Sequence, residues 1–182
     1  MNSAVVTLSG LPGSGKTTVG RRVAETVGLA FTSAGEIFRQ TASERGLDLL
    51  AFSHLAEREE AIDRDLDRQM LSLAHPGRLL EGRVTGALCR QQQIPCVYLE
   101  LTAEEPVRVT RIAQRDGTEI DETRRRLVER TASERARYRR YYHIDLDREH
   151  ADCAVDSTQL DVEAVTDRFV RFLRSPRPSS SP

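Results

Sequence analysis

The sequence predicts an α/β fold in which a parallel sheet carries helices on both of its faces. Short apolar runs alternate along the 182 residues with longer segments of helical periodicity, which is the pattern of repeated strand–helix units. The first apolar run, 4–8, leads into a glycine-rich loop, and that loop leads into a helix. The length fits one domain, so we expect a single domain over 1–174 and a disordered, Pro- and Ser-rich tail over 175–182.

The glycine-rich loop reads Gly-Leu-Pro-Gly-Ser-Gly-Lys-Thr over 10–17, the G-x-x-x-x-G-K-T spacing of a phosphate-binding loop (P-loop). Glycines let the backbone curl so that successive N–H groups point at one anion, and the N-terminus of the next helix, 18–27, adds the positive end of its dipole. We expect Lys16 to reach the β- and γ-phosphates and the Thr17 hydroxyl to bind Mg²⁺. The predicted ATP-binding residues are Gly10, Leu11, Pro12, Gly13, Ser14, Gly15, Lys16, Thr17 and Thr18.

The basic residues single out the same position. Lys16 is the only lysine among 27 lysines and arginines. Arginine is a planar fork, whereas lysine is a compact point charge on a flexible stem. A preference for arginine explains the other basic residues but not the exception, which falls where a narrow phosphate cradle favours a point charge.

The remaining elements follow in alternation and complete a P-loop NTPase fold with a five-stranded sheet. The other expected strand segments are the apolar link 29–32, then 79–80, 96–101 and 151–155. The other expected helices are 36–45, 48–75 with a break near 59–60, 84–92, 102–115 opened by a Thr102–Glu105 capping box, 121–142, and 161–174 capped by Asp161. Ligands of such folds bind at the carboxyl ends of the strands. The segments that follow strands, 10–17, the expected turn 33–35 and 81–83, should therefore meet there.

Composition excludes several classes of function. The formal net charge is −1, so the chain as a whole is not an electrostatic nucleic-acid binder. Glutamates interleaved with the arginines of 121–142 argue against a continuous phosphate track there. No apolar stretch is long enough to span a membrane and no signal-peptide pattern is present. Three widely spaced cysteines suit a reduced, cytoplasmic protein, the four histidines have no metal-ligand spacing, and we expect a monomer.

The P-loop indicates a nucleotide but not a reaction. GTPases need an N-K-x-D motif, and the chain has no second lysine to supply one. Motor ATPases and helicases usually need longer chains. Phosphoryl transfer depends on positioning and on cations around the transferred group, which arginines can supply with bidentate geometry. A small chain with one P-loop and many arginines therefore favours a small-molecule kinase.

Four further segments carry a resemblance to a family. They are Ser-Ala-Gly-Glu-Ile-Phe-Arg at 33–39, Leu-Glu-Gly-Arg at 80–83, Arg-Ile-Ala-Gln-Arg at 111–115 and Tyr-Tyr-His-Ile-Asp-Leu-Asp at 141–147. Together with the P-loop they resemble the nucleoside monophosphate kinases, and most of all the short archaeal-type cytidylate kinases, over residues 4–172. The resemblance implies a small helical acceptor-binding region and a short lid, because little chain separates Arg115 from Asp121.

The resemblance also implies roles for individual residues. Arg39 is expected to hold the acceptor phosphate rather than to be solvated. Ser33, Gly35, Gly82 and Arg83 are expected on the acceptor side, with Arg83 near the base. Glu81 is expected to hold Mg²⁺ through water, although many relatives of the fold carry Asp there. The 82–86 segment lacks an Asp that the similar bacterial G-R-D-I-G segment has, which weakens the base contact.

Two groups of arginines complete the expected site. Arg111 and Arg115 resemble the arginines at the start of the lid, near ATP and the transferred phosphoryl group. Arg130, Glu134 and Arg137 reproduce a bacterial R-x-x-x-D-x-x-R spacing with Glu for Asp. Residues four and seven apart share one helix face, so Glu134 is expected to orient both guanidiniums toward phosphate or sugar. Lys16, Arg111, Arg115, Arg130 and Arg137 are the predicted catalytic residues.

Other charged residues are interpreted as solvated helix faces. These are Arg124, Arg125, Arg126, Arg139 and Arg140, together with Asp63 and Asp67, for which contact with a cytosine amino group is the alternative. The sequence thus predicts an ATP- and Mg²⁺-dependent kinase for CMP or dCMP. It leaves open UMP or a modified cytidylate as acceptor, another small metabolite, and a nucleotide-binding sensor without kinase activity.

Overall fold

A computed structural model describes residues 4–175, and its five strands form one sheet in the order β2-β3-β1-β4-β5 with every neighbouring pair parallel. The strands are β1 (Val5–Ser9), β2 (Ala30–Ser33), β3 (Arg78–Glu81), β4 (Cys96–Thr102) and β5 (Cys153–Asp156). The helices are α1 (Lys16–Val27), α2 (Ala34–Glu44), α3 (Leu49–Arg58), α4 (Glu60–Ser72), α5 (Thr85–Gln91), α6 (Glu105–Asp116), α7 (Ile120–Tyr142) and α8 (Val162–Arg174). The predicted five-stranded parallel α/β fold is confirmed.

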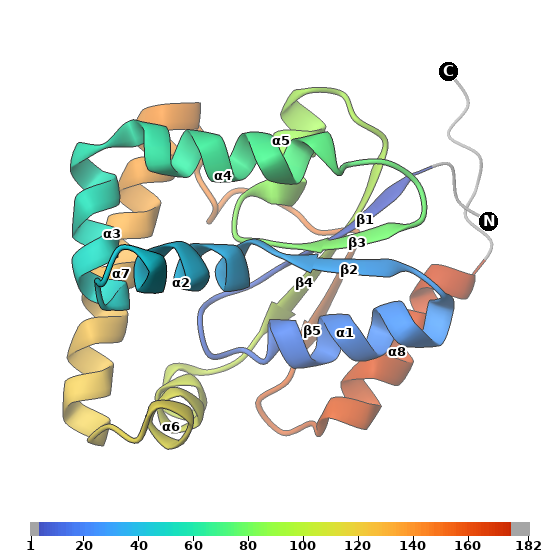
Figure 1. The fold of residues 1–182 in the computed structure, drawn as a ribbon. Coiled ribbons are helices and arrows are strands. Elements are labelled where there is room, and N and C mark those ends of the chain that lie inside the picture. The colour runs from blue at the N-terminus through green and yellow to red at the C-terminus, as the bar shows by residue number, and fades with distance from the viewer. Residues whose placement is uncertain (1–3, 176–182) are drawn as a thin grey trace.

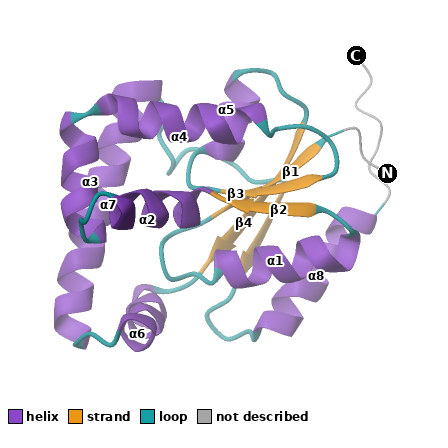
Figure 2. Cartoon of the chain, viewed as in Figure 1, coloured by secondary structure: helices purple, strands orange, loops and turns teal. Residues whose placement is uncertain are grey.

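Helices cover both faces of the sheet (Figures 1 and 2). Side chains alternate along each strand, so each face presents apolar residues that a helix can bury. Val6 and Leu8 of β1 belong to a buried cluster with Val23 of α1 and Phe169 of α8. Val5 points the other way, into a cluster that includes Cys89 of α5. Each face thus has its own apolar core, and β1 lies at the centre of both.

A group of helices lies beyond the ends of the strands. Figure 1 shows α2, α3 and α7 together there, and a core that includes Phe38 of α2 and Phe52 of α3 holds α2 against α3. The rings of this pair lie 4.6 Å apart between centroids. The predicted break near 59–60 is confirmed, since α3 ends at Arg58 and α4 begins at Glu60.

Two local predictions are wrong. Residues 33–35 are not a free turn, because Ser33 ends β2 and caps α2, its hydroxyl accepting a hydrogen bond from the Glu36 N–H. The capping box of Thr102 and Glu105 does not form, because Thr102 is the last residue of β4. Helix α6 starts later, at Glu105, with Pro106 in its first turn and no side-chain cap.

Three residues, 117–119, separate α6 from α7, in keeping with the short connection expected for the lid. Asp161 caps α8 as predicted, accepting a hydrogen bond from the Ala164 N–H. The expected tail falls outside the described residues except for Ser175, which follows α8 as its C-cap. Within 4–175, no helix has the length and apolar character needed to cross a membrane.

Candidate active site

The P-loop connects β1 to α1 and is shaped by glycines in conformations that other residues rarely adopt. Gly13 has φ +83° and Gly15 has φ +95°. A Cβ atom at Gly10 would lie 2.0 Å from the carbonyl oxygen of Leu101. Gly15 caps α1 with no side-chain hydrogen bond, and the first turn of α1 has no acidic residue. The first N–H groups of α1 are therefore available to an anion.

Lys16 and Thr17 converge on Glu81 at the carboxyl end of β3. The Lys16 Nζ donates to the Leu11 carbonyl at 3.0 Å and lies 3.9 Å from Glu81 Oε1. Burial lowers the pKa of Lys16 to about 8, although Glu81 partly offsets this. The Thr17 hydroxyl donates to Glu81 Oε2 at 3.1 Å, and the Ser33 hydroxyl donates to the same oxygen. Ser33 thus contacts Glu81, and it is not among the residues that line the cavity described below.

Two arginines of α6 support the P-loop from its other side. Arg108 is buried and donates to the carbonyl oxygens of Ala103 at 3.0 Å and Pro12 at 3.2 Å. Arg111 donates to the Ser14 carbonyl at 3.3 Å and to both the hydroxyl and the carbonyl of Ser157. The loop after β5 and helix α6 therefore hold the P-loop together.

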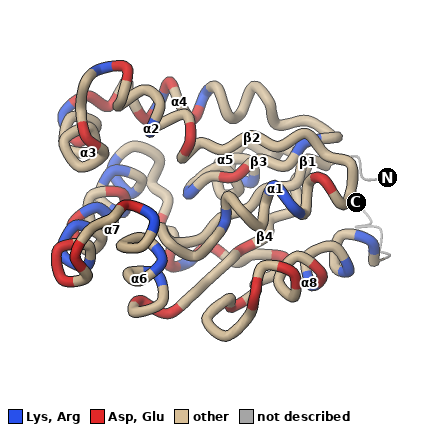
Figure 3. Tube along the Cα trace, turned by 60° about the horizontal axis from the view of Figure 1, so that its bottom comes forward, with Lys and Arg blue, Asp and Glu red and all other residues tan. Residues whose placement is uncertain are grey.

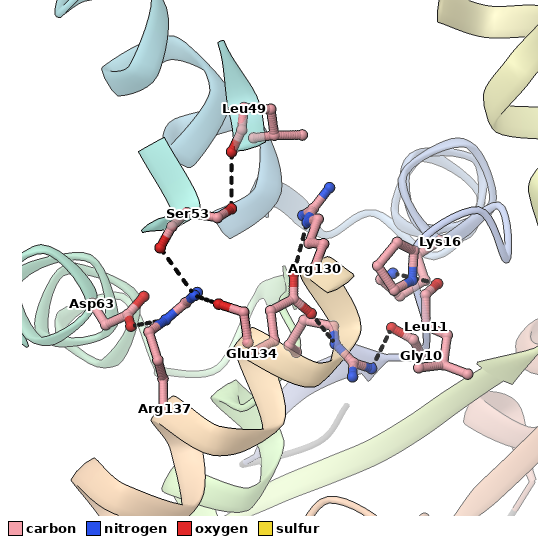
Figure 4. Close-up of polar contacts among 12 residues, drawn as sticks. Gly10, Leu11, Lys16, Leu49, Ser53, Asp63, Arg130, Glu134 and Arg137 are labelled. Atoms are coloured by element: carbon pink, nitrogen blue, oxygen red, sulfur yellow. Dashed lines mark hydrogen bonds and ion pairs between the residues drawn. The ribbon is translucent and has the colours of Figure 1, made fainter. Parts of the chain in front are cut away.

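Glu134 of α7 is the centre of a buried charge cluster (Figure 4). Its two carboxylate oxygens accept hydrogen bonds from Arg83 and Arg130, both at 2.9 Å. Arg83 also donates to the Gly10 carbonyl at 2.9 Å, which links α7 to the P-loop. Burial opposes ionisation of Glu134, but Arg130 and Arg83 outweigh it and lower the pKa to about 2.

Arg137 differs from the prediction, since its partner is not Glu134. Its Nε donates to Asp63 of α4 at 2.6 Å, and both side chains are buried (Figure 4). Although burial lowers the pKa of Arg137, Asp63 outweighs it and the net shift is upward. Glu134 therefore orients Arg130 and Arg83, while Arg137 joins α7 to α4.

The prediction that Asp63 and Asp67 form a solvated face is wrong. Their exposed fractions are 3% and 6%. Asp67 accepts a hydrogen bond from the Tyr142 hydroxyl at 2.7 Å. The arginines interpreted as solvated, in contrast, are exposed, and basic and acidic segments intermingle along α7 (Figure 3).

Arg39 and Arg115 are the most weakly engaged of the predicted cations. Within residues 4–175, Arg39 makes no hydrogen bond or ion pair, and burial together with nearby Arg115 lowers its pKa. Arg115 is largely exposed and forms a two-point pair with the neighbouring Asp116, with N···O distances of 2.6 and 2.9 Å. Both side chains line the cavity and could meet an anion there.

One cavity of about 890 Å³ brings these groups together. We call one part of its wall the loop side, formed by residues 12–19, Arg111 and Ser157. We call the opposite part the helix side, formed by the lining residues of α2, α3, α4 and α7. The predicted site residues that line it are Pro12, Gly13, Ser14, Gly15, Lys16, Thr17, Thr18, Gly35, Arg39, Glu81, Gly82, Arg83, Arg111, Arg115, Arg130, Glu134 and Arg137. Gly10 and Leu11 contribute backbone carbonyls behind this wall.

Comparison with known proteins identifies the family. A family model described as an AAA domain matches residues 9–145. The cytidylate kinase of Methanocaldococcus jannaschii is 38% identical over 164 residues, covering 88% of this chain and 92% of the relative. The chain belongs to the cytidylate kinase family. Another member, from Methanopyrus kandleri, is 41% identical over 151 residues, with 79% of this chain and 78% of the relative covered.

Solved structures support the fold of this family member. Shikimate kinase from Acinetobacter baumannii, in complex with shikimate, superposes with a TM-score of 0.60 at 19% identity. The match covers 94% of this chain and 93% of the other. At this identity the similarity concerns the fold.

Sequence reasoning missed Arg108 and Ser157. Arg108 precedes Arg111 by three residues, so both fall on the same face of α6. Ser157 directly follows β5, at the end of the sheet where ligands bind. The position of each residue in its element therefore pointed to the site, but neither residue was distinguished from the other arginines and turn residues of the chain.

Proposed function

We propose that the protein is an ATP-dependent cytidylate kinase that transfers the γ-phosphoryl group of ATP to the phosphate oxygen of CMP or dCMP. The observation that carries the proposal is the cavity of about 890 Å³, which joins a P-loop on one side to Arg39, unpaired among residues 4–175, on the other. Two phosphorylated ligands could lie end to end in it. The curated relatives are named cytidylate kinases.

On the loop side, ATP phosphates would bind the P-loop N–H groups and the N-terminus of α1. Lys16 would exchange its Leu11 and Glu81 contacts for phosphate oxygens, and their negative charge would keep its ammonium protonated. Arg111 would remain beside the phosphates because Ser157 and the Ser14 carbonyl hold its guanidinium.

Thr17 and Glu81 fit a magnesium site. Mg²⁺ prefers oxygen ligands and usually keeps waters beside one or two protein groups and substrate phosphates. The Thr17 hydroxyl and a Glu81 oxygen already lie 3.1 Å apart. Thr17 would bind the ion directly and Glu81 through water, and the ion would neutralise charge on the phosphates.

On the helix side, Arg39 would hold the acceptor phosphate, with Arg130 and Arg83 beside it. Glu134 fixes the guanidiniums of Arg130 and Arg83, so these groups need not reorganise when charge develops in the transition state. Arg115 would leave Asp116 and join the phosphates. The acceptor phosphate is already anionic, so the reaction needs no strong general base. Closure of α6 and α7 over the ligands would exclude water and suppress ATP hydrolysis.

The test is a coupled assay of ADP production with CMP, dCMP, UMP and AMP as acceptors. Turnover on CMP or dCMP well above that on UMP and AMP supports the proposal. Preference for another acceptor would reassign the substrate within the same class of kinase. ATP binding with no turnover on any acceptor would instead indicate a nucleotide-binding sensor.

A further inference from the structure

One carboxylate of the cavity wall differs from the others. Asp63, Asp67, Glu81 and Glu134 are the buried acidic residues that line the cavity. Asp63 pairs with an arginine, Glu134 with two arginines, and Glu81 faces Lys16. Among the residues that the structure describes, Asp67 has no cationic partner. Burying an ionised carboxylate without a partner is costly. The burial of Asp67 without a cation therefore calls for an explanation other than an ion pair.

The surroundings of Asp67 leave one carboxylate oxygen free. The Tyr142 hydroxyl donates to Oδ2, and no hydrogen bond between described residues involves Oδ1. The charged and titratable groups that act on it are Asp63 on its own helix and Arg137, Tyr138 and Tyr142 on α7. Burial raises the pKa of Asp67 to about 7, against the opposing effect of the Tyr142 hydrogen bond. Near neutral pH, both of its protonation states are therefore accessible.

Asp67 lies where an acceptor base would be placed. The acceptor phosphate must lie near Lys16 and Arg39 to receive the phosphoryl group. Its base must then extend along the helix side, whose lining includes the apolar walls of Phe38, Leu66 and Tyr138 as well as Asp67. An aromatic base fits such walls, and the Oδ1 atom of Asp67, which no described residue binds, is available to a donor on the ligand.

We propose that Asp67 selects the acceptor base, with Oδ1 accepting a hydrogen bond from the exocyclic amino group of cytosine. The inference rests on the proposed function and adds the residue that sets its specificity. Carboxylates accept hydrogen bonds from cytosine N4 in other recognition sites. Uracil carries the acceptor O4 at that position, so the ionised Asp67 would face a second acceptor and both groups would stay unpaired.

Asp67→Asn is the direct test. The Tyr142 hydroxyl is a donor to Oδ2, so it favours an amide oxygen on its side and leaves the amide N–H₂ facing the cavity. That group donates to uracil O4 and repels the cytosine amino group. We expect the ratio of kcat/KM for CMP over UMP to fall about 100-fold or more, roughly the discrimination of one well-placed base contact. AMP, whose base also carries an exocyclic amino group, is measured in parallel.

Asp65→Asn is the matched control, because it makes the same change on the same helix at an exposed residue outside the cavity wall. We expect it to leave the ratio unchanged. If Asp67→Asn keeps the wild-type ratio while melting like the wild type, the inference is wrong and the proposed function stands. If the wild type itself shows no preference for cytosine nucleotides, the proposed function fails instead.

A second measurement needs no variant, in case Asp67→Asn does not fold. The ionised Asp67 accepts from cytosine N4, whereas its protonated form can donate to uracil O4. The wild-type CMP-to-UMP ratio of kcat/KM should therefore rise about tenfold between pH 6 and pH 8. Titration of Lys16 and of the acceptor phosphate affects both substrates alike and cancels in the ratio. A ratio that stays flat across this range overturns the inference.

Discussion

The two sides of the cavity hold their charges by different means. The loop side depends mainly on backbone geometry, because glycines with positive φ and the N-terminus of α1 form the proposed anion site beside the ammonium of Lys16. On the helix side, side chains from α4 and α7 form buried ion pairs, such as Arg137 with Asp63. The loop side is thus set by a few consecutive residues, whereas the helix side depends on contacts between segments about 70 residues apart.

This difference separates binding chemistry from stability. Groups on the loop side are arranged for a ligand and do little to hold the fold together. Groups on the helix side are arranged for each other, and removing one leaves its partner buried and unpaired. Substitutions on the two sides should therefore affect activity and the free energy of unfolding in different proportions.

Lys16→Ala should give the largest effect of all, and this effect should fall on activity and not on stability. Removing a preorganised cation from the transferred phosphoryl group should lower kcat by about 10²- to 10³-fold. Because burial lowers the pKa of Lys16 to about 8, the surrounding protein disfavours its charged form, and stability should not fall. A coupled assay and thermal melting measure the two quantities. The exposed Arg22→Ala on α1 is the control, and a kcat within threefold of wild type would contradict the assignment.

Glu134→Ala should reduce both activity and stability. It leaves Arg83 and Arg130 without their shared carboxylate, at a cost of about 3 kcal/mol in the free energy of unfolding. The pKa of Glu134 is lowered to about 2, so its contribution is present above about pH 4.5 and is lost as the pH falls toward 2. Urea unfolding at several pH values tests this. The exposed Glu129→Ala on the same helix should change neither quantity, and equal stability of the two variants would refute the prediction.

Asp67 should affect the pH dependence of stability in the opposite sense to Glu134, and Asp67→Asn should remove this effect. A carboxyl group whose pKa is raised to about 7 stabilises the folded state at low pH, and this contribution is lost as the pH rises to 7. Between pH 5 and pH 8 the wild type should lose on the order of 2–3 kcal/mol that the variant does not lose. Chemical unfolding across this range gives the difference. Parallel curves for the two proteins would show that Asp67 is ionised at pH 5.

Asp116→Ala should have the smallest effect. The pair of Arg115 with Asp116 is largely exposed, and exposed pairs contribute about 0.5 kcal/mol. Because Arg115 would leave Asp116 when phosphates bind, kcat/KM should stay within about threefold of wild type. Steady-state kinetics and thermal melting check both. A loss comparable to that of Glu134→Ala would mean that Asp116 has a role in the site.

The loop side could be predicted from the sequence because its geometry is local. The order of strand, glycine loop and helix over 4–27 determines where the phosphate cradle lies, and Lys16 and Thr17 follow from the spacing alone. The parallel sheet and the break between α3 and α4 were also predictable, since they depend on alternation and on local polarity.

Arg39, Arg130 and Glu134 of the helix side were predicted as site residues and line the cavity, but the contacts of Asp63 and Asp67 could not be predicted, because these polar residues occupy core positions. Asp63, Asp67 and Met70 are spaced four and three apart and form the buried stripe of α4. Two carboxylates in such a stripe look like a solvated face until Arg137 and Tyr142 are known to pack against them. Glu134 was assigned the wrong second arginine for the same reason, since the true partner, Arg83, comes from the loop after β3.

The solitary lysine gives the protein an unusual chemical simplicity. Burial lowers the pKa of its ε-amine to about 8, so a larger fraction is unprotonated at neutral pH than in an ordinary lysine, which stays almost wholly protonated there. Any acylating or carbonyl reagent that attacks side-chain amines therefore has a single target in the chain, Lys16. Lys16 lies in the P-loop, so covalent modification of the lysine would obstruct the proposed ATP site.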